Sequence, residues 1–356
     1  MSNSGLNNKA GFITGADRTG TNKTGENKRF SFALASRWTS VVLSGVTLIA
    51  STPLLLRPGF AQSAQSSVQL VPAQTLASYP EGSFLESIVI NSSGTMYISR
   101  HETGEVIQRS PNGTLSTLAA ISNGMIVGLA LDRDETLYAV GGQKEQPLKT
   151  VYRISAAGSM EPLMTIPDAK FLNGMTLLQP GVFLVADSTV GVVWRVDVGS
   201  RTATVWLQDE SLSPQTPDSR FPGANGIKIF DGAAYVSNSD RRHIMRVPIQ
   251  ANGAAGQPEL FASDTFADDF AFAPDGTLYL ATHPTNTVVA FCRDGSRRVI
   301  AEAAQGVVGS TAVAFGVGSD RNHLYVVSNG GVFAPLNGEL QPAKLVQLTL
   351  SESVCR

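Results

Sequence analysis

A two-strand pattern recurs six times along this chain of 356 residues and constrains the fold more than any other feature. In each copy, a short apolar strand is followed by a turn and by a second strand with an aromatic residue near its start. These aromatics are spaced by 41, 45, 52, 44 and 46 residues, and they are Tyr97, Tyr138, Phe183, Tyr235, Tyr279 and Tyr325. Repeats of this length, each with several strands, are typical of a β-propeller.

A third strand follows in every repeat, and a fourth follows in the first five. The sixth repeat has no fourth strand, whereas the segment SVQLVPAQ at residues 67–74 precedes the first repeat without a partner. If this segment joins the sixth repeat, the ring closes and an exposed sheet edge is removed. The sequence therefore predicts an all-β fold, a six-bladed β-propeller closed by an N-terminal strand. A β-sandwich, the alternative for many short strands, does not require six near-equal repeats.

Residues 1–61 differ in character from the repeats and are interpreted as a signal or targeting segment. They include the uncharged apolar stretch TSVVLSGVTLIASTPLLL, and Gly59 and Ala61 then provide a small-residue cleavage site. We expect cleavage near Gln62, which leaves residues 62–356 as the propeller of a secreted or periplasmic protein. Because the apolar stretch approaches membrane-spanning length, an uncleaved membrane anchor is the alternative.

The charge balance and the cysteine content narrow the classes of partner. Charged residues make up 16% of the chain and the formal net charge is −2, so there is no electrostatic reason to expect a nucleic-acid partner. The chain has two cysteines, Cys292 and Cys355. An exported protein permits a disulfide between them, but two thiols do not establish one, and the sequence leaves their pairing open.

The first strand of each propeller blade lines the central channel, so the first residues of these strands meet at one mouth of it. In this chain they are Glu86, Val127 or Gly128, Asn173, Asn225, Asp268 and Thr311. Two carboxylates and two carboxamides among them form a hard-oxygen ligand set that suits Ca²⁺ or another divalent cation. Asp269 can add a further oxygen. The absence of sulfur and imidazole from the set argues against zinc and copper. The alternative is that Asn173 and Asn225 only form Asn-Gly turns.

The segments around these residues, FLESIVINSSG, FLNGMTLL, GANGIKIF and ADDFAFAPDG, resemble the calcium-dependent six-bladed propellers of the regucalcin/gluconolactonase family. A more distant similarity is to the paraoxonases. The resemblance covers roughly residues 67–350 and implies that Glu86, Asn173, Asn225 and Asp268 surround the metal, with Asp269 at the position of a further paraoxonase ligand. The family's Glu commonly opens a Glu-Gly-Pro-x-Trp motif, which is absent after Glu86, and Glu81–Gly82 lies upstream out of register.

The sequence predicts an exported, metal-dependent, lactonase-type hydrolase that acts on a lactone or a related small ester. The cation would polarise the carbonyl, and a carboxylate or a histidine would deprotonate water. Asp268 is the candidate base, and His283 or His101 could move a proton. There is no Gly-x-Ser-x-Gly motif, which argues against an α/β-hydrolase mechanism. Two alternatives are a non-enzymatic propeller with a structural axial ion and a strictosidine-synthase-like enzyme.

Overall fold

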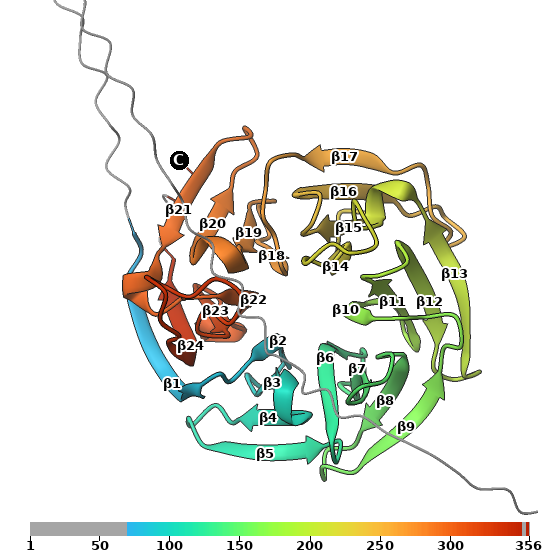
Figure 1. Cartoon of the computed structure of the whole chain (residues 1–356), viewed down its shortest axis with the longest axis horizontal. Helices are drawn as coiled ribbons and strands as arrows, with labels where there is room; N and C mark the ends of the chain where they lie inside the picture. The colour runs from blue at the N-terminus through green and yellow to red at the C-terminus, as the bar shows by residue number, and fades with distance from the viewer. Residues whose placement is uncertain (1–69, 351–353, 356) are drawn as a thin grey trace, which may run out of the picture. The chain divides into compact units, whose positions relative to one another are not determined.

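The computed structural model describes residues 70–350 and 354–355, which form six four-stranded antiparallel sheets around a common axis (Figure 1). From the axis outward, the first three sheets are β2 (Leu85–Ile90), β3 (Met96–Arg100), β4 (Glu105–Arg109) and β5 (Leu115–Ala120); β6 (Gly124–Leu131), β7 (Leu137–Gln143), β8 (Thr150–Ile154) and β9 (Met160–Thr165); and β10 (Leu172–Gln179), β11 (Val182–Asp187), β12 (Val192–Asp197) and β13 (Thr202–Gln208).

The next two sheets are β14 (Ala224–Phe230), β15 (Ala233–Asn238), β16 (His243–Pro248) and β17 (Glu259–Ala262); and β18 (Phe270–Phe272), β19 (Leu278–Ala281), β20 (Val288–Phe291) and β21 (Arg297–Ala301). The sixth consists of β22 (Ser310–Phe315), β23 (His323–Ser328), β24 (Pro342–Thr349) and β1 (Ala73–Glu81). Five short 3₁₀ helices lie in the connections: η1 (His101–Thr103), η2 (Glu210–Leu212), η3 (His283–Thr285), η4 (Ala303–Gln305) and η5 (Gly318–Asp320). The prediction of an all-β six-bladed propeller is confirmed.

The ring closes through an N-terminal strand, as expected, but the position predicted for that strand was wrong. The strand that pairs with β24 is β1, with Ala73 opposite Leu348 and Glu81 opposite Pro342, so it shares only Ala73 and Gln74 with the predicted segment 67–74. Because β1 is an outermost strand, one side of it faces solvent and its apolar alternation is weak. Val71 precedes β1, and its amide donates to the carbonyl of Ile300 in the fifth blade.

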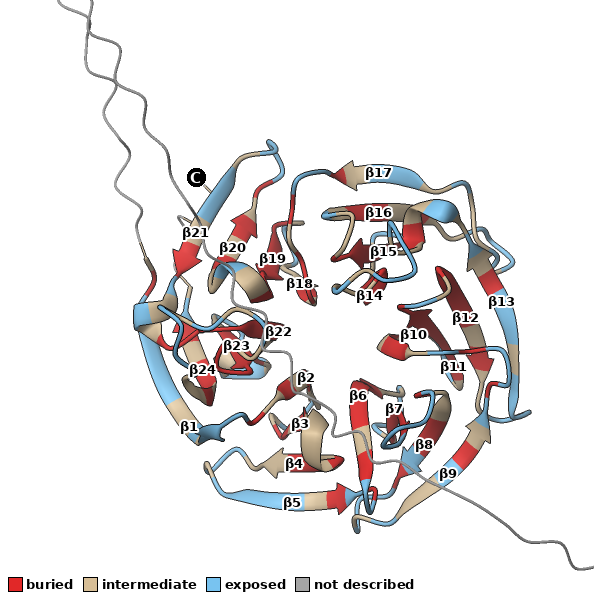
Figure 2. Ribbon diagram, viewed as in Figure 1, coloured by how far each residue is buried: buried red, intermediate tan, exposed pale blue. Residues whose placement is uncertain are grey.

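The core lies between neighbouring blades and explains the repeated aromatic residue. Figure 2 shows that the inner strands are largely buried, whereas the outermost strand of each blade carries most of the exposed residues. Tyr138 of the second blade meets Phe183 of the third, with ring centroids 4.9 Å apart. Tyr235 of the fourth blade likewise meets Phe272 of the fifth at 4.6 Å. These two marker aromatics each fill an interface between neighbouring sheets. Because such an interface occurs once per blade, a repeated aromatic residue suits it.

A disulfide joins Cys292, in the turn after β20, to Cys355 near the C-terminus. This contact resolves the pairing that the sequence left open. Val354 and Cys355 pack against the apolar cluster shared by the fifth and sixth blades, so the bond ties the end of the chain to the fifth blade. The expected targeting segment, residues 1–61, lies outside the described residues. In the described part of the chain, no helix is long and apolar enough to cross a membrane.

Candidate functional site

The residues predicted to line the axis occupy equivalent positions at the start of the innermost strands. The first paired residues of β2, β10 and β14 with their neighbouring strands are Leu85, Leu172 and Ala224. Glu86, Asn173 and Asn225 come one position later, and Asp268 lies just before β18. In the second blade this place is taken by Val127, which is buried and apolar.

Both Asn-Gly pairs lie inside strands, so the turn interpretation of Asn173 and Asn225 does not describe them. Neither following glycine has a positive φ, and each is required for close approach of the next blade. A Cβ on Gly174 would lie 2.4 Å from the carbonyl oxygen of Asn225, and one on Gly226 would lie 2.6 Å from that of Asp268. The glycines therefore bring successive axial residues together.

Glu86, Asn173, Asn225 and Asp268 converge between two cavities on the axis. All four line a small cavity of about 10 Å³ together with Asp269, and all four line the floor of a larger cavity of about 510 Å³. The small cavity has about the volume needed for one water molecule. The repeat register thus correctly predicted which four side chains share one place.

Two serines that the sequence analysis did not single out orient the carboxamides. Ser188 Oγ donates to the carbonyl of Ala224 at 2.7 Å, so it accepts the hydrogen bond from Asn173 Nδ2 at 3.1 Å. Ser239 repeats this arrangement, since it donates to the carbonyl of Ala267 and accepts from Asn225 Nδ2 at 2.9 Å. Because the amide nitrogens are engaged in this way, both Oδ1 atoms are left for another partner.

The polar residues that end β11 and β15 are Asp187 and Asn238, and both bind backbone groups. Asp187 accepts hydrogen bonds from the backbone amides of Lys170 and Phe171, and the Asn238 amide donates to the carbonyls of Ser211 and Ser213. The signal that could have identified the serines is their offset from the axial residues. Ser188 follows Asp187 and Ser239 follows Asn238, each one residue beyond the strand end.

Glu86 is a half-buried residue whose carboxylate has one buried, unsatisfied oxygen. Its Oε2 atom has no hydrogen-bond partner among the described residues. Burial raises the pKa of Glu86 well above its ordinary value, and the nearby charges of Asp268 and Asp269 raise the pKa further. An unpaired buried carboxylate beside another carboxylate is unfavourable unless a cation or a proton compensates.

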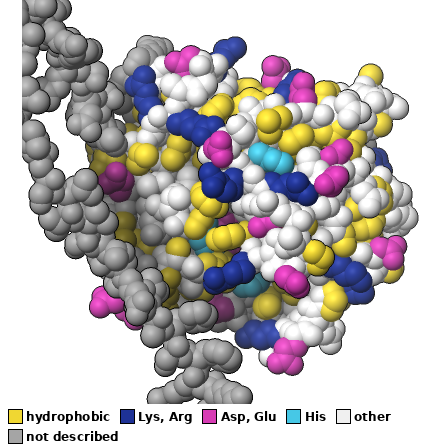
Figure 3. Space-filling view, turned by 45° about the horizontal axis from the view of Figure 1, so that its top comes forward, with side chains coloured by type: hydrophobic (Ala, Val, Ile, Leu, Met, Phe, Trp, Pro, Cys, Tyr) yellow, Lys and Arg dark blue, Asp and Glu magenta, His cyan; other side chains and the backbone are white. Residues whose placement is uncertain are grey.

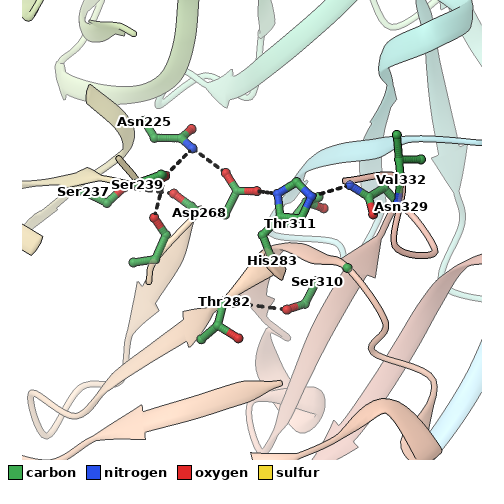
Figure 4. A network of polar contacts seen from close by, with 12 residues as sticks. Asn225, Ser237, Ser239, Asp268, Thr282, His283, Ser310, Thr311, Asn329 and Val332 are labelled. Atoms are coloured by element: carbon green, nitrogen blue, oxygen red, sulfur yellow. Dashed lines mark hydrogen bonds and ion pairs between the residues drawn. The ribbon is translucent and has the colours of Figure 1, made fainter. Parts of the chain in front are cut away.

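Asp268 is held on both sides by hydrogen bonds. Its Oδ1 accepts from Asn225 Nδ2 at 2.5 Å, and its Oδ2 lies 2.6 Å from His283 Nδ1 (Figure 4). His283 Nε2 in turn lies 2.7 Å from Asn329 Nδ2. Asn329 Oδ1 accepts from the amides of Gly331 and Val332, which fixes the orientation of this carboxamide.

The orientation of Asn329 determines the tautomer of His283. Because Asn329 Nδ2 can only donate, His283 Nε2 is the acceptor and Nδ1 carries the proton that is donated to Asp268. His283 also has a φ of 37°, a left-handed conformation that costs a non-glycine residue of the order of 1 kcal/mol. Both predicted catalytic residues, Asp268 and His283, are thus in direct contact, and each uses both of its polar side-chain atoms.

Asp269 is compensated by a lysine. Lys228 Nζ lies 2.5 Å from Asp269 Oδ1 and 2.6 Å from Oδ2, and it also lies over the ring of Phe270. Burial raises the pKa of Asp269, and the positive charge of Lys228 opposes this rise. Asp269 was predicted as a further metal ligand. Its negative charge is already compensated by Lys228, whereas the carboxylate of Glu86 has no such partner among the described residues.

The four axial side chains fit a hard cation by the chemistry of their donors. They provide an unpaired carboxylate oxygen on Glu86, the carboxylate of Asp268 and the carboxamide oxygens of Asn173 and Asn225, whose amide nitrogens are engaged by other groups. Oxygen ligands of this kind are those that Ca²⁺ prefers. Within the described residues, no group of three or more His, Cys, Asp and Glu side chains is arranged to hold a metal ion, so the two carboxamides are essential to the fit.

The larger cavity has a polar floor and aromatic walls. Phe84 and Phe333 lie on one side with ring centroids 5.8 Å apart, and Phe221 and Phe266 form a second pair at 6.2 Å. Phe333 is 53% exposed and lines this cavity. In Figure 3, hydrophobic side chains and histidines lie among basic and acidic ones, without a large area of one charge. A cavity of this size and lining suits a small organic molecule.

The chain has no match among protein-family models or curated proteins. Solved structures do resemble it. A gluconolactonase from Xanthomonas campestris superposes with a TM-score of 0.60 at 16% identity, covering 82% of this chain and 94% of that one. Regucalcin from Agrobacterium tumefaciens, a calcium-binding protein, has a TM-score of 0.57 at 16% identity and covers 80% and 97%. Virginiamycin B lyase from Staphylococcus aureus has a TM-score of 0.53 at 13% identity and covers 79% and 99%.

These neighbours agree with the resemblance to gluconolactonase and regucalcin propellers that the sequence suggested. At such low identity they establish the fold alone. Because a lyase is among them, the fold does not decide the reaction, and the function has to be argued from the site.

Proposed function

We propose that this protein is a metal-dependent hydrolase of a lactone or a related ester, with Ca²⁺ held by Glu86, Asn173, Asn225 and Asp268. The observation that carries the proposal is the buried, unpaired Oε2 atom of Glu86, close to Asp268 in a cavity large enough for an organic substrate. A bound cation would offset both negative charges and leave part of its coordination shell facing the cavity.

The residues of the chain would divide the work as follows. When bound, the ion supplies polarisation of the substrate carbonyl and stabilisation of the developing oxyanion. Ser188 and Ser239 keep the carboxamides of Asn173 and Asn225 oriented, and His283 fixes the carboxylate of Asp268 through Nδ1–H. Asp268 is a weak candidate for the base, because both its oxygens already accept hydrogen bonds.

The walls of the cavity favour a substrate with an apolar group. The carbonyl would lie at the polar floor, and the rest of the molecule would contact Phe84, Phe333, Phe221 and Phe266. Binding of an aryl or alkyl group against these rings gains about 0.8 kcal/mol for each methylene removed from water. A highly hydroxylated sugar lactone would make less use of these walls.

We further propose that the protein is exported. The Cys292–Cys355 disulfide supports this, because disulfides persist in oxidising compartments and are rare in the cytosol.

The test is a hydrolysis screen over lactones and aryl esters, with and without Ca²⁺. We expect hydrolysis that is abolished by a chelator, restored by Ca²⁺ and faster for apolar than for hydroxylated lactones. Calcium binding without hydrolysis of any compound would instead favour a non-enzymatic propeller with a structural axial ion. Hydrolysis that persists in the chelator would contradict the metal-dependent mechanism.

A further inference from the structure

We infer that His101 is the general base of the proposed hydrolysis, taking the proton of the attacking water on Nε2. This inference rests on the proposed function and identifies a residue other than Asp268 and His283 for this step. It follows from a second ring of side chains that lines the larger cavity together with the axial residues.

The second ring consists of the residues that follow the second strand of a blade. Leu85 pairs with Arg100, Leu172 with Asp187 and Ala224 with Asn238, so the next residue of each second strand accompanies an axial residue. The resulting pairs are Glu86 with His101, Asn173 with Ser188 and Asn225 with Ser239. Asp268 with His283 is the corresponding pair of the fifth blade. All of these residues line the larger cavity.

His101 is anchored in the same way as the two serines. Its Nδ1 lies 3.1 Å from the carbonyl oxygen of Ile126, the residue before Val127 in the second blade. Ser188 and Ser239 bind the carbonyls of Ala224 and Ala267, which likewise precede the axial residue of the next blade. A carbonyl can only accept, so Nδ1 of His101 is the protonated nitrogen and Nε2 of the neutral ring carries the lone pair.

His101 is the member of this ring with a free basic nitrogen. Ser188 and Ser239 commit their protons to backbone carbonyls, and both nitrogens of His283 are engaged by Asp268 and Asn329. Among the described residues, no side chain or backbone group forms a hydrogen bond with His101 Nε2. This atom is therefore available to a water molecule or a substrate in the cavity.

The surroundings of His101 favour its neutral form. Burial lowers the pKa of His101, and the positive charge of Lys144 lowers it further, whereas the hydrogen bond to Ile126 and the charge of Glu102 raise it. Phe84 packs against the His101 ring with centroids 5.3 Å apart and also contacts the His283 ring at 6.0 Å. The other ionisable groups that line the cavity are Glu86, on the first strand of the same blade, Asp268, His283 and Arg220.

The proton transfers balance within one turnover. The water oxygen bonds to the carbonyl carbon as its proton moves to His101 Nε2. The bond between the carbonyl carbon and the ester oxygen then breaks, and the imidazolium returns the proton to the leaving alkoxide. The products are a carboxylic acid and an alcohol, or one hydroxy acid from a lactone, and His101 is again neutral.

The decisive variant is His101→Asn, measured at saturating Ca²⁺ on the aryl ester or lactone that the wild type hydrolyses fastest. The asparagine amide can still donate to Ile126 but provides no base. We expect kcat/KM to fall by about 10²- to 10⁴-fold, while calcium affinity and melting temperature stay near those of the wild type. His243→Asn is the matched control, since His243 binds Ser211 outside the cavity and its loss should leave activity unchanged.

Two further readouts separate a base from a structural residue. The pH profile of kcat/KM should have an acid limb below pH 6.5 in the wild type that disappears in His101→Asn. Added imidazole should restore part of the activity of His101→Ala. If the wild type is active and His101→Asn keeps kcat/KM within about threefold, the base assignment is wrong and the proposed function stands. If the wild type hydrolyses no ester or lactone with Ca²⁺, the proposed function fails and this inference fails with it.

Discussion

Removal of the Cys292–Cys355 disulfide should weaken the propeller by several kilocalories per mole. The bond closes a loop across a sequence separation of 63 residues. Loop-closure entropy of the unfolded chain then corresponds to about 14 cal/mol/K, or about 4 kcal/mol at 25 °C. For a chain of this size, about 2 °C of melting temperature per kcal/mol gives a decrease of roughly 8 °C.

Cys355→Ser is the better variant for this measurement, because Cys292 is almost fully buried and its replacement would also disturb packing. Thermal and denaturant unfolding of Cys355→Ser should match those of the reduced wild type and differ from those of the oxidised protein. Equal stability of the oxidised and reduced wild type would refute the reasoning, since it would mean that the bond does not restrict the unfolded chain or does not form.

Three other predictions concern charged and terminal groups. Burial raises the pKa of Tyr279 and Tyr325 from 10.0 to about 12. Their contribution to the free energy of unfolding is therefore complete below pH 10 and is lost as the pH rises toward 12. Unfolding measured from pH 8 to 12 should show this loss of stability, and Tyr279→Phe should reduce it. Lys228→Met leaves the Asp269 carboxylate without its cation and should destabilise the protein by about 2 kcal/mol in urea unfolding. This is less than the ~3–5 kcal/mol lost when a fully buried ion pair is broken. An unchanged urea midpoint would argue against a stabilising Lys228–Asp269 ion pair. Intact-mass analysis of the exported protein should show a chain that begins near Gln62, and retention of residues 1–61 would favour an anchor.

The repeat predicted the blade number and the axial residues because both depend on spacing along the chain. A residue such as Asn173 or Asn225 can be placed on the axis once the register of its strand is known. The closing strand β1 was misplaced because it lies at the outer edge of its blade. There, six of its nine residues are exposed and Pro80 is tolerated, so residues 73–81 show little of the apolar alternation of an inner strand.

The contacts around the axial residues could not be predicted from spacing. Asp269 follows Asp268 directly, yet Lys228, some 40 residues earlier in the chain, neutralises it. The pairing of His283 with Asn329 spans 46 residues and two blades. Such contacts depend on rotamers and on the twist between sheets, which a linear pattern does not contain. For the same reason, the free Nε2 of His101 became evident only when the hydrogen bonds of its neighbours were known.

The most direct test of the account is calorimetric titration of Ca²⁺ into the wild type, Asp268→Asn and the surface control Asp264→Asn. We predict one site in the wild type, an affinity at least about tenfold lower in Asp268→Asn, equivalent to about 1.4 kcal/mol, and unchanged binding in the control. A wild type that binds no calcium, or an Asp268→Asn variant that binds it as tightly as the wild type, would contradict the claim that the axial carboxylates hold a cation.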